Sequence, residues 1–318
     1  MHDVAVVGDA NVDIVVPYPK FRNEERTLVD YPTPCLLGGG TAANTAVALA
    51  RLDINTSFFG TVGDDPYGRY IEKELKSEGI DTSNLVVDPA LNTVGVFAFI
   101  DENGERYLWG WPREKQSFKV LDMDRISMDR ITKSQWVHSS GMSLVYDTSA
   151  RYTIIKIFER ASSLGIPTSF DLNLRVDNGV LDPEYERAVR EIIKYTTYLL
   201  GSGKDEFAYL GSSRDWEENA RQFVTDKRTV VVRNGANGSV GLCAGKRIGV
   251  PAFKVKVEDT VGAGDVYNAG LIKGILDGRG LEESLRMGNA VSGYTLTGKG
   301  AGHCPGSDEL MEFIRENS

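Results

Sequence analysis

A short run, residues 259–265, combines glycines with carboxylates in a pattern that suits the binding of an anion. It reads Asp-Thr-Val-Gly-Ala-Gly-Asp, and the segment that directly follows predicts a helix. Unpaired backbone N–H groups converge at the first turn of a helix, so Gly262, Ala263 and Gly264 predict an anion hole. Asp265 stands at its mouth, where a carboxylate could take a proton from an incoming hydroxyl. Phosphoryl transfer to an alcohol needs both features, although an Asp that merely caps a helix remains the simpler interpretation.

Two short polar side chains follow the first predicted strand. Residues 3–8 form an apolar, β-branched run that ends in Gly, which is typical of a strand buried in a parallel sheet. Asn11 and Asp13 come just after it, at the strand end where ligands bind in open α/β sheets. They therefore predict a ligand site, with a plain Asn/Asp turn as the alternative.

Glycines at residues 38–40 precede an alanine-rich run that predicts another helix. Gly39 and Gly40 would let the backbone approach a small ligand closely, and Asn44 would offer a donor and an acceptor from the first turns. A hydroxylated ligand fits these groups. A dinucleotide does not, because the run is not Gly-x-Gly-x-x-Gly and lacks the acidic residue expected about 20 positions later.

Further polar residues follow later predicted strands. Asp171, Asn173 and Arg175 alternate with leucines, so an extended chain would place all three on one side. The strand at 198–200 leads to a Gly- and Lys-containing loop. The strand beginning at Thr229 leads to a Gly turn that predicts the wall of a nucleotide site.

Strands alternate with helices along most of the chain, which predicts an α/β fold with a mostly parallel central sheet and helices on both faces. Thr93–Trp111 interrupts this pattern with two strands around a turn at 101–104, and residues 12–16 could add a third strand. We expect these segments, about 11–33 and 92–118, to form a small β-sheet lid. No repeat or linker divides residues 1–318, so a single domain is expected.

Composition excludes several classes of partner. The chain has 318 residues, 41% of them hydrophobic, and a net charge of −9. This charge argues against nucleic acid and anionic membranes as partners. The three scattered cysteines suit a reducing compartment, and no apolar run approaches the roughly 18 residues of a membrane span. We expect a cytoplasmic protein with no nucleic-acid or membrane partner.

Together these motifs resemble those of the ribokinase-type carbohydrate kinases, also called the phosphofructokinase-B family. Residues 39–44 and 60–68 are similar to the first signature of that family, and residues 259–265 to the second. The resemblance covers nearly the whole chain and implies a ribokinase-like three-layer sandwich. It also implies an ATP-dependent kinase that phosphorylates a primary hydroxyl of a sugar, with Mg²⁺ and often a monovalent cation such as K⁺.

The resemblance assigns roles by motif position. Asp265 is the base, and Gly262, Ala263 and Gly264 form the anion hole. The implied sugar-binding residues are Asn11, Asp13, Gly39, Gly40 and Asn44. The implied nucleotide-side residues are Lys204, Asn234, Gly235, Gly238 and Asn289, and the implied metal and cation residues are Asp205, Asp259, Val261 and Cys304.

One motif departs from the family pattern. The Asn-x-x-Glu motif, tied to the water network of the metal, appears here as Ser-Gly-Lys-Asp at 202–205. Asp205 keeps a negative charge on a shorter arm, whereas Ser202 lacks the amide of Asn.

The substrate remains open at this point. Residues 171–175 resemble the fructokinase and 2-keto-3-deoxygluconate kinase branches, and recognition of a sugar acid would rest on Arg113 and Arg175. A neutral sugar, a polyol and a sugar acid all fit. A nucleoside kinase of the same family and a catalytically silent sugar sensor are the alternatives. Trp109 and Trp111 could cover a sugar, pack against a second lid in a homodimer, or simply form the core of the lid.

Overall fold

The computed structural model describes residues 3–101, 106–111 and 113–317. The main-sheet strands are β1 (Asp3–Val7), β6 (Asn55–Gly63), β7 (Asp81–Asp88), β10 (Trp136–Ser140), β11 (Thr168–Asp171), β14 (Tyr198–Ser202), β15 (Thr229–Arg233), β16 (Ser239–Cys243) and β17 (Lys246–Val250). They are ordered β17-β16-β15-β14-β11-β10-β1-β6-β7. Neighbours from β15 to β7 are parallel, whereas β16 is antiparallel to β15 and to β17. The predicted mostly parallel sheet is confirmed.

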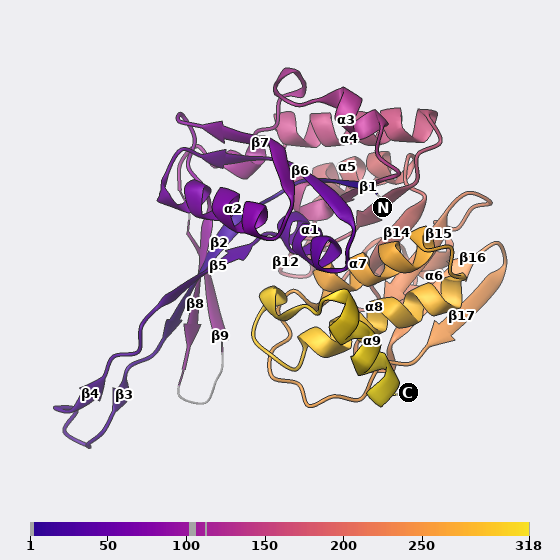
Figure 1. Cartoon of the computed structure of the whole chain (residues 1–318). Coiled ribbons are helices and arrows are strands. Elements are labelled where there is room, and N and C mark those ends of the chain that lie inside the picture. The colour runs from indigo at the N-terminus through magenta and orange to yellow at the C-terminus, as the bar shows by residue number, and fades with distance from the viewer. Residues whose placement is uncertain (1–2, 102–105, 112, 318) are drawn as a thin grey trace.

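Helices cover both faces of this sheet (Figure 1). One face carries α1 (Thr41–Arg51), α2 (Pro66–Ser77), α7 (Ala263–Leu276), α8 (Leu281–Thr295) and α9 (Ser307–Glu316). The other carries α3 (Met128–Thr132), α4 (Ser149–Ser163), α5 (Pro183–Ile193) and α6 (Trp216–Arg221). Short 3-10 turns are η1 (Ser117–Lys119), η2 (Met123–Arg125), η3 (Gly141–Leu144), η4 (Phe207–Tyr209), η5 (Gly235–Asn237) and η6 (Ala301–His303).

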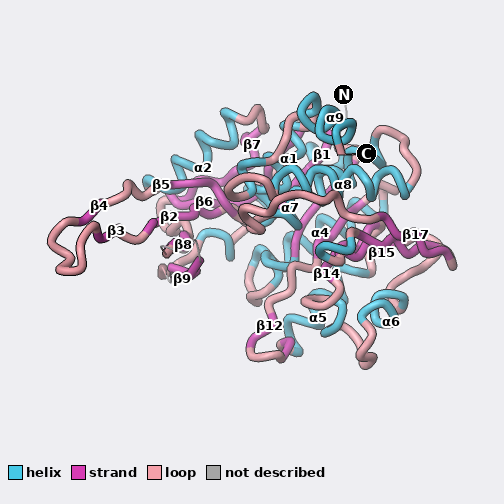
Figure 2. Tube along the Cα trace, turned by 90° about the horizontal axis from the view of Figure 1, so that it is seen from below, coloured by secondary structure: helices cyan, strands magenta, loops and turns pink. Residues whose placement is uncertain are grey.

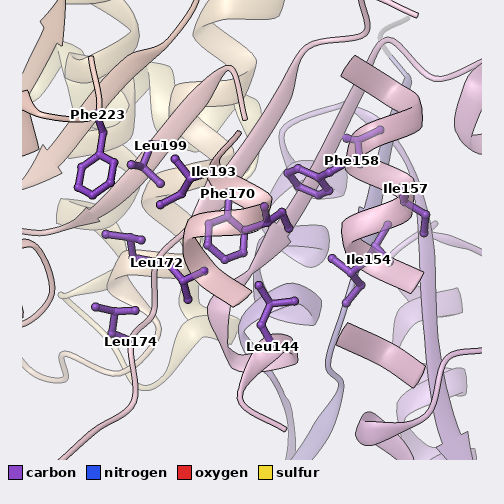
Figure 3. Packing of buried hydrophobic residues seen from close by; sticks show 14 of the residues in the cluster. Leu144, Ile154, Ile157, Phe158, Phe170, Leu172, Leu174, Ile193, Leu199 and Phe223 are labelled. Atoms are coloured by element: carbon purple, nitrogen blue, oxygen red, sulfur yellow. The ribbon is translucent and has the colours of Figure 1, made fainter. Parts of the chain in front are cut away.

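Apolar side chains fill the space between the sheet and each helical layer. Figure 3 shows part of the cluster beneath α4, where Phe158 of that helix meets Phe170 of β11 edge to face, with ring centroids 6.2 Å apart. Burial of such side chains stabilises the fold by about 1.5 to 3 kcal/mol each. The core therefore fixes the strands whose C-terminal ends carry the polar motifs.

A second sheet projects from the molecule as a lid (Figures 1 and 2). Its order is β5-β2-β8-β9, with β2 (Asn11–Pro17), β5 (Cys35–Gly39), β8 (Gly95–Ile100) and β9 (Arg106–Trp111). The two-residue strands are β3 (Lys20–Phe21) with β4 (Val29–Asp30), and β12 (Val176–Asp177) with β13 (Val180–Leu181). The predicted hairpin and its added strand β2 are confirmed. Most of the turn predicted at 101–104 lies outside the described residues.

Strand β5 was not predicted as part of the lid. It pairs with β2 along Val15 to Asn11, so the lid also includes residues 35–39, beyond the predicted 11–33. Two of its five residues are glycines, which lowers the strand propensity of the segment. Pairing with β2 outweighs that local preference.

Within the described part of the chain, no helix is both long and apolar enough to cross a membrane.

Candidate active site

A cavity of about 800 Å³ lies between the lid and the C-terminal edge of the main sheet. Parallel strands end at the same edge, so motifs far apart in the sequence meet there. The predicted site residues that line the cavity are Asn11, Asp13, Gly40, Asn44, Arg175, Val261, Gly262 and Asp265. The lid contributes an apolar ceiling of Val15, Val94, Val96, Ala98 and Leu108.

The first turn of α7 opens toward this cavity. Gly262 is the N-cap residue, with φ 76° and ψ −2°, and no side chain caps the helix. A Cβ atom at this residue would lie 2.3 Å from Cβ of Ala301, so both the torsion and the space require glycine. Backbone N–H groups of an uncapped helix start favour an anion. The predicted helix and its glycine turn are confirmed, whereas anion binding stays a prediction.

Asp265 lies in the same first turn and is 7% exposed. Nδ2 of Asn44 donates a hydrogen bond to Oδ2 of Asp265 at 2.8 Å. Burial raises the pKa of Asp265 well above its ordinary value, and the hydrogen bond from Asn44 partly opposes the rise. A carboxylate with a raised pKa is a stronger base than an exposed one, which suits proton abstraction.

Asn11 and Asp13 lie together on β2. Nδ2 of Asn11 donates to Oδ1 of Asp13 at 3.1 Å. A Cβ atom on Gly39 of the paired strand would lie 2.9 Å from both of these atoms. Gly40 has φ 101°, and its Cβ would lie 2.7 Å from the carbonyl oxygen of Asp9. Both glycines therefore pack closely against neighbouring protein atoms, whereas their close approach to a ligand stays a prediction.

Asp9 has a role that sequence reasoning missed. Oδ2 of this buried residue accepts from the backbone N–H of Thr41, and Oδ1 accepts from the Thr41 hydroxyl, both at 2.9 Å. Gly40, the N-cap residue, has no side chain to cap α1. Asp9, which follows β1, therefore caps α1 in its place and fixes the turn that carries Asn44.

The prediction that Asp171, Asn173 and Arg175 share one side of an extended chain is wrong. Asn173 has φ 35°, which breaks the alternation. Asp171 is 1% exposed and bonded within the protein, and Oδ1 of Asn173 is buried with no hydrogen-bond partner among the described groups. Of the three, only Arg175 lines the cavity.

The proposed substrate role of Arg113 is not supported by its contacts. One of its Nη atoms donates to Oδ2 of Asp65 at 2.7 Å and to the carbonyl of Thr93, and the other donates to Oδ1 of Asn92. Its guanidinium lies 4.7 Å from the Trp111 ring, and the residue does not line the cavity. Arg113 thus clamps both strands of the lid hairpin to the start of α2. Asp65 also caps that helix, accepting from the N–H groups at 67 and 68.

The predicted cation loops lie side by side. Oδ1 of Asp259 accepts from the N–H of Val261, and Oδ2 accepts from the N–H of Gly300 at 2.8 Å. Cys304 is buried, and burial raises the pKa of its thiol to about 11. Its carbonyl accepts a hydrogen bond from Nη1 of Arg51 at 3.1 Å. The role of Cys304 as a cation residue stays a prediction.

The predicted nucleotide-side residues lie apart from the cavity lining. Asn234, Gly235 and Gly238 form the turn between β15 and β16, where the glycines have φ 55° and 84°. Lys204 is exposed. Nδ2 of the buried Asn289 donates to the carbonyls of residues 250 and 251, so this amide nitrogen anchors the chain beyond β17.

A second carboxylate directly follows the altered metal motif. Asp205 is exposed and accepts from the Ser202 hydroxyl at 3.0 Å. Its neighbour Glu206 is buried, accepts from the N–H of Leu174 at 2.9 Å, and has its pKa raised to about 7 by burial. Among the described residues, no group of three or more His, Cys, Asp or Glu is arranged to hold a metal ion.

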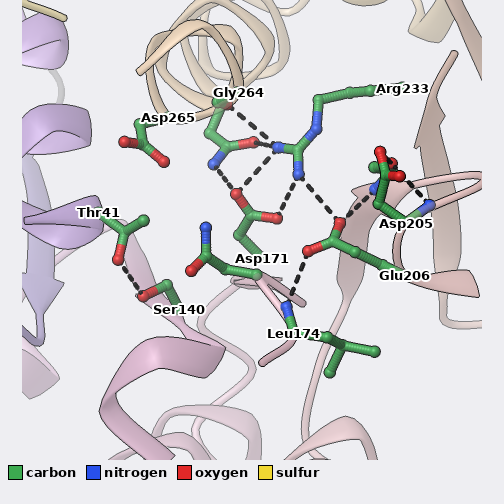
Figure 4. A network of polar contacts seen from close by, with 12 residues as sticks. Thr41, Ser140, Asp171, Leu174, Asp205, Glu206, Arg233, Gly264 and Asp265 are labelled. Atoms are coloured by element: carbon green, nitrogen blue, oxygen red, sulfur yellow. Dashed lines mark hydrogen bonds and ion pairs between the residues drawn. The ribbon is translucent and has the colours of Figure 1, made fainter. Parts of the chain in front are cut away.

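Sequence reasoning also missed Arg233, which joins a polar network beside Asp265 (Figure 4). A charged residue that ends an otherwise apolar parallel strand was the available signal.

Comparison with known proteins agrees with this architecture. A model described as "pfkB family carbohydrate kinase" matches residues 1–308. A fructokinase from Vibrio alginolyticus is 30% identical, covering 99% of both chains. A 5-dehydro-2-deoxygluconokinase from Lacticaseibacillus casei is 29% identical, covering 99% of this chain and 96% of its own.

Solved structures share the fold. Aminoimidazole riboside kinase from Salmonella enterica matches with a TM-score of 0.80 at 24% identity, over 98% of this chain and 99% of its own. A fructokinase with bound ATP from Xylella fastidiosa matches with a TM-score of 0.82 at 22% identity, over 99% and 98%. The fold is ribokinase-like, as the resemblance implied. The chain belongs to the pfkB family of carbohydrate kinases.

Proposed function

We propose that this carbohydrate kinase transfers the γ-phosphoryl group of ATP to a primary hydroxyl of a sugar or sugar acid, with Asp265 as the general base. The observation that carries the proposal is the position of Asp265 in the uncapped first turn of α7, at the wall of the cavity. One turn of helix then offers both a proton acceptor and anion-binding amides. Phosphoryl transfer needs positioning and charge stabilisation more than covalent chemistry.

The remaining cavity groups suit a hydroxylated substrate. Asn11, Asp13 and Asn44 present amide and carboxylate groups that can pair with sugar hydroxyls. Val96 and Leu108 of the lid lie above them and would exclude water once the lid closes. The substrate hydroxyl would hydrogen-bond to the Asp265 carboxylate while Asn44 keeps its bond to Oδ2, and would release its proton to that carboxylate.

The proposal places the nucleotide and metal at the C-terminal edge of the main sheet. The turn at residues 234–238 would hold ATP with its phosphates directed to Gly262–Gly264. Mg²⁺ commonly takes one or two carboxylates together with substrate phosphates, and Asp205 or Glu206 could meet that need directly or through water. When bound, the ion would neutralise charge on the phosphates.

A monovalent cation such as K⁺ is part of the proposal. Asp259 already links residues 261 and 300, so the two loops lie close enough to share an ion. The Val261 carbonyl remains the main-chain candidate ligand beside the Asp259 carboxylate.

The proposal includes a homodimer that forms through the lid. On the face of β8 and β9 opposite the cavity, Phe97 stacks with Phe99 and lies 5.7 Å from Trp109, which is 59% exposed. An exposed aromatic face of this kind is typical of a protein interface. Light scattering should give twice the mass of the chain, and Trp109→Lys should reduce it.

An ADP-release screen over hexoses, pentoses, sugar acids, polyols and nucleosides tests the function. A small sugar or sugar acid should give turnover that Asp265→Asn abolishes. Turnover confined to nucleosides would favour the alternative kinase. Sugar binding in thermal-shift assays without ADP release would favour a silent sensor.

A further inference from the structure

Arg233 ends β15 and ties together three elements beneath the active-site helix (Figure 4). Its guanidinium makes a two-pronged ion pair with Asp171 of β11, at 2.6 and 2.9 Å. The same group reaches Oε2 of Glu206 at 3.4 Å. Arginine is suited to such forked contacts in a way that lysine is not.

The guanidinium also holds α7. Nη1 of Arg233 donates to the carbonyl of Gly264 at 3.1 Å and to Oδ1 of Asn268 at 2.8 Å. Nδ2 of Asn268 in turn donates to Asp171 at 2.7 Å, which closes a ring of bonds between helix and sheet. A Cβ atom on Gly264 would lie 3.4 Å from Cζ of Arg233, so the guanidinium packs directly against this turn.

Charge in this region is unbalanced without Arg233. Asp171, Glu206 and Asp265 are 1%, 6% and 7% exposed. Arg233, 16% exposed at its side chain, is the cation bonded to two of these carboxylates and to the turn that carries the third. Buried carboxylates without a compensating cation are strongly unfavourable.

We propose that Arg233 is a positioning residue for phosphoryl transfer, which holds the turn at Gly262–Gly264 and Asp265 in a fixed relation to the sheet. This inference rests on the proposed function. Arg233 does not line the cavity, so it acts through the turn and not on the substrate. The sugar-binding groups on β2 and α1 make no bond to it among the described contacts.

Substitution at Arg233 should therefore lower kcat more than it affects sugar binding. We expect Arg233→Lys, which keeps charge but loses the fork, to lower kcat by about 10-fold to 100-fold, with KM for sugar changed less than about 3-fold. Added guanidinium should restore part of the turnover of Arg233→Ala. Arg130 makes a comparable two-pronged pair with Asp3 at the opposite edge of the sheet, so Arg130→Lys and Arg130→Ala are matched controls expected to keep wild-type kcat.

Two results would overturn the proposal. One is a loss of kcat in Arg233→Lys that is fully explained by a smaller folded fraction, as measured by circular dichroism. The other is wild-type kcat with a raised KM for sugar. If Arg233→Ala does not fold, Arg233→Lys alone decides through the split between kcat and KM. Asp265→Asn measured in parallel separates the two proposals, because its inactivity supports the function whatever Arg233 does.

Discussion

Asn44 and Asp265 are joined by a hydrogen bond of 2.8 Å from Nδ2 to Oδ2, although 221 residues separate them in the chain. The bond links the start of α1 to the start of α7, and Oγ1 of Thr45 adds a second bond to the backbone carbonyl of Asp265. The proposed base is thus already oriented before substrate binds. Such preorganisation avoids a rearrangement during the reaction.

Asn44→Ala should weaken sugar binding and lower turnover together. The change removes a group that faces the substrate and also frees the carboxylate of Asp265. We expect kcat/KM to fall by about 10-fold to 100-fold, the effect of losing one or two hydrogen bonds to a charged group. Thr45→Val is the matched control, because it disturbs the same helix contact without touching the carboxylate. Equal losses in the two variants would mean that helix packing alone is responsible.

The pH dependence should reflect the raised pKa of Asp265. The base works only when deprotonated, so kcat/KM should fall as pH drops, with a midpoint above the ordinary aspartate value of about 3.9. Asn44→Ala removes a bond that lowers this pKa, so the midpoint should move to higher pH. A midpoint of the kcat/KM profile at or below about pH 4, the range of an ordinary aspartate, would contradict this account.

The same shift affects stability. A carboxyl with a raised pKa in the folded state stabilises the fold fully below its unfolded value of about 3.9, and this contribution is lost as pH rises through the folded pKa. Asp265→Asn should therefore raise the melting temperature more at pH 8 than at pH 5. Glu206 titrates in both proteins and largely cancels in the comparison.

Arg175 and Arg113 should behave differently when replaced by alanine. Arg175 lines the cavity, so its loss should lower kcat/KM for sugar acids by about 10-fold or more while neutral sugars change little. Arg113 clamps the root of the lid, so its loss should affect all substrates alike. A selective loss of ATP affinity in Arg175→Ala would instead place this residue on the phosphates.

Lid closure should be visible in tryptophan fluorescence. Trp111 contacts Tyr67 at the root of the lid, with ring centroids 5.4 Å apart, whereas Trp109 lies on the outer face. Saturating sugar should change the emission, and Trp111→Phe should remove most of the change. Unchanged emission and unchanged hydrogen exchange in β8 and β9 would show that the lid does not move.

Local sequence patterns predicted the glycine turn and the first strand. The turn needs a positive φ at Gly262, which favours glycine, and the strand is a buried run, Val4–Val7, whose residues are apolar. The course of residues 171–175 was not predictable in this way. Asn173 has φ 35°, and Leu172 and Leu174 on either side of it are both buried. Tertiary packing, which alternation along a short segment does not reveal, decides that geometry.

Charge partners were equally hidden. The sequence singled out Asp205, yet the buried carboxylate is Glu206, since only the fold brings Arg233 and the N–H of Leu174 to that side chain. Arg113 was predicted to bind the carboxylate of a sugar acid. In the structure it pairs instead with the carboxylate of Asp65 in the same chain. Long-range pairing of this kind requires the structure.

The central claim is that Asp265 accepts the substrate proton, and steady-state kinetics of Asp265→Asn on the substrate found by the screen tests it most directly. The variant keeps shape and burial, so KM for sugar should change little while kcat falls by about 10² to 10⁴-fold. Asp277→Asn, the same change at the other end of α7, should keep wild-type kcat. A near wild-type kcat for Asp265→Asn would contradict the mechanism.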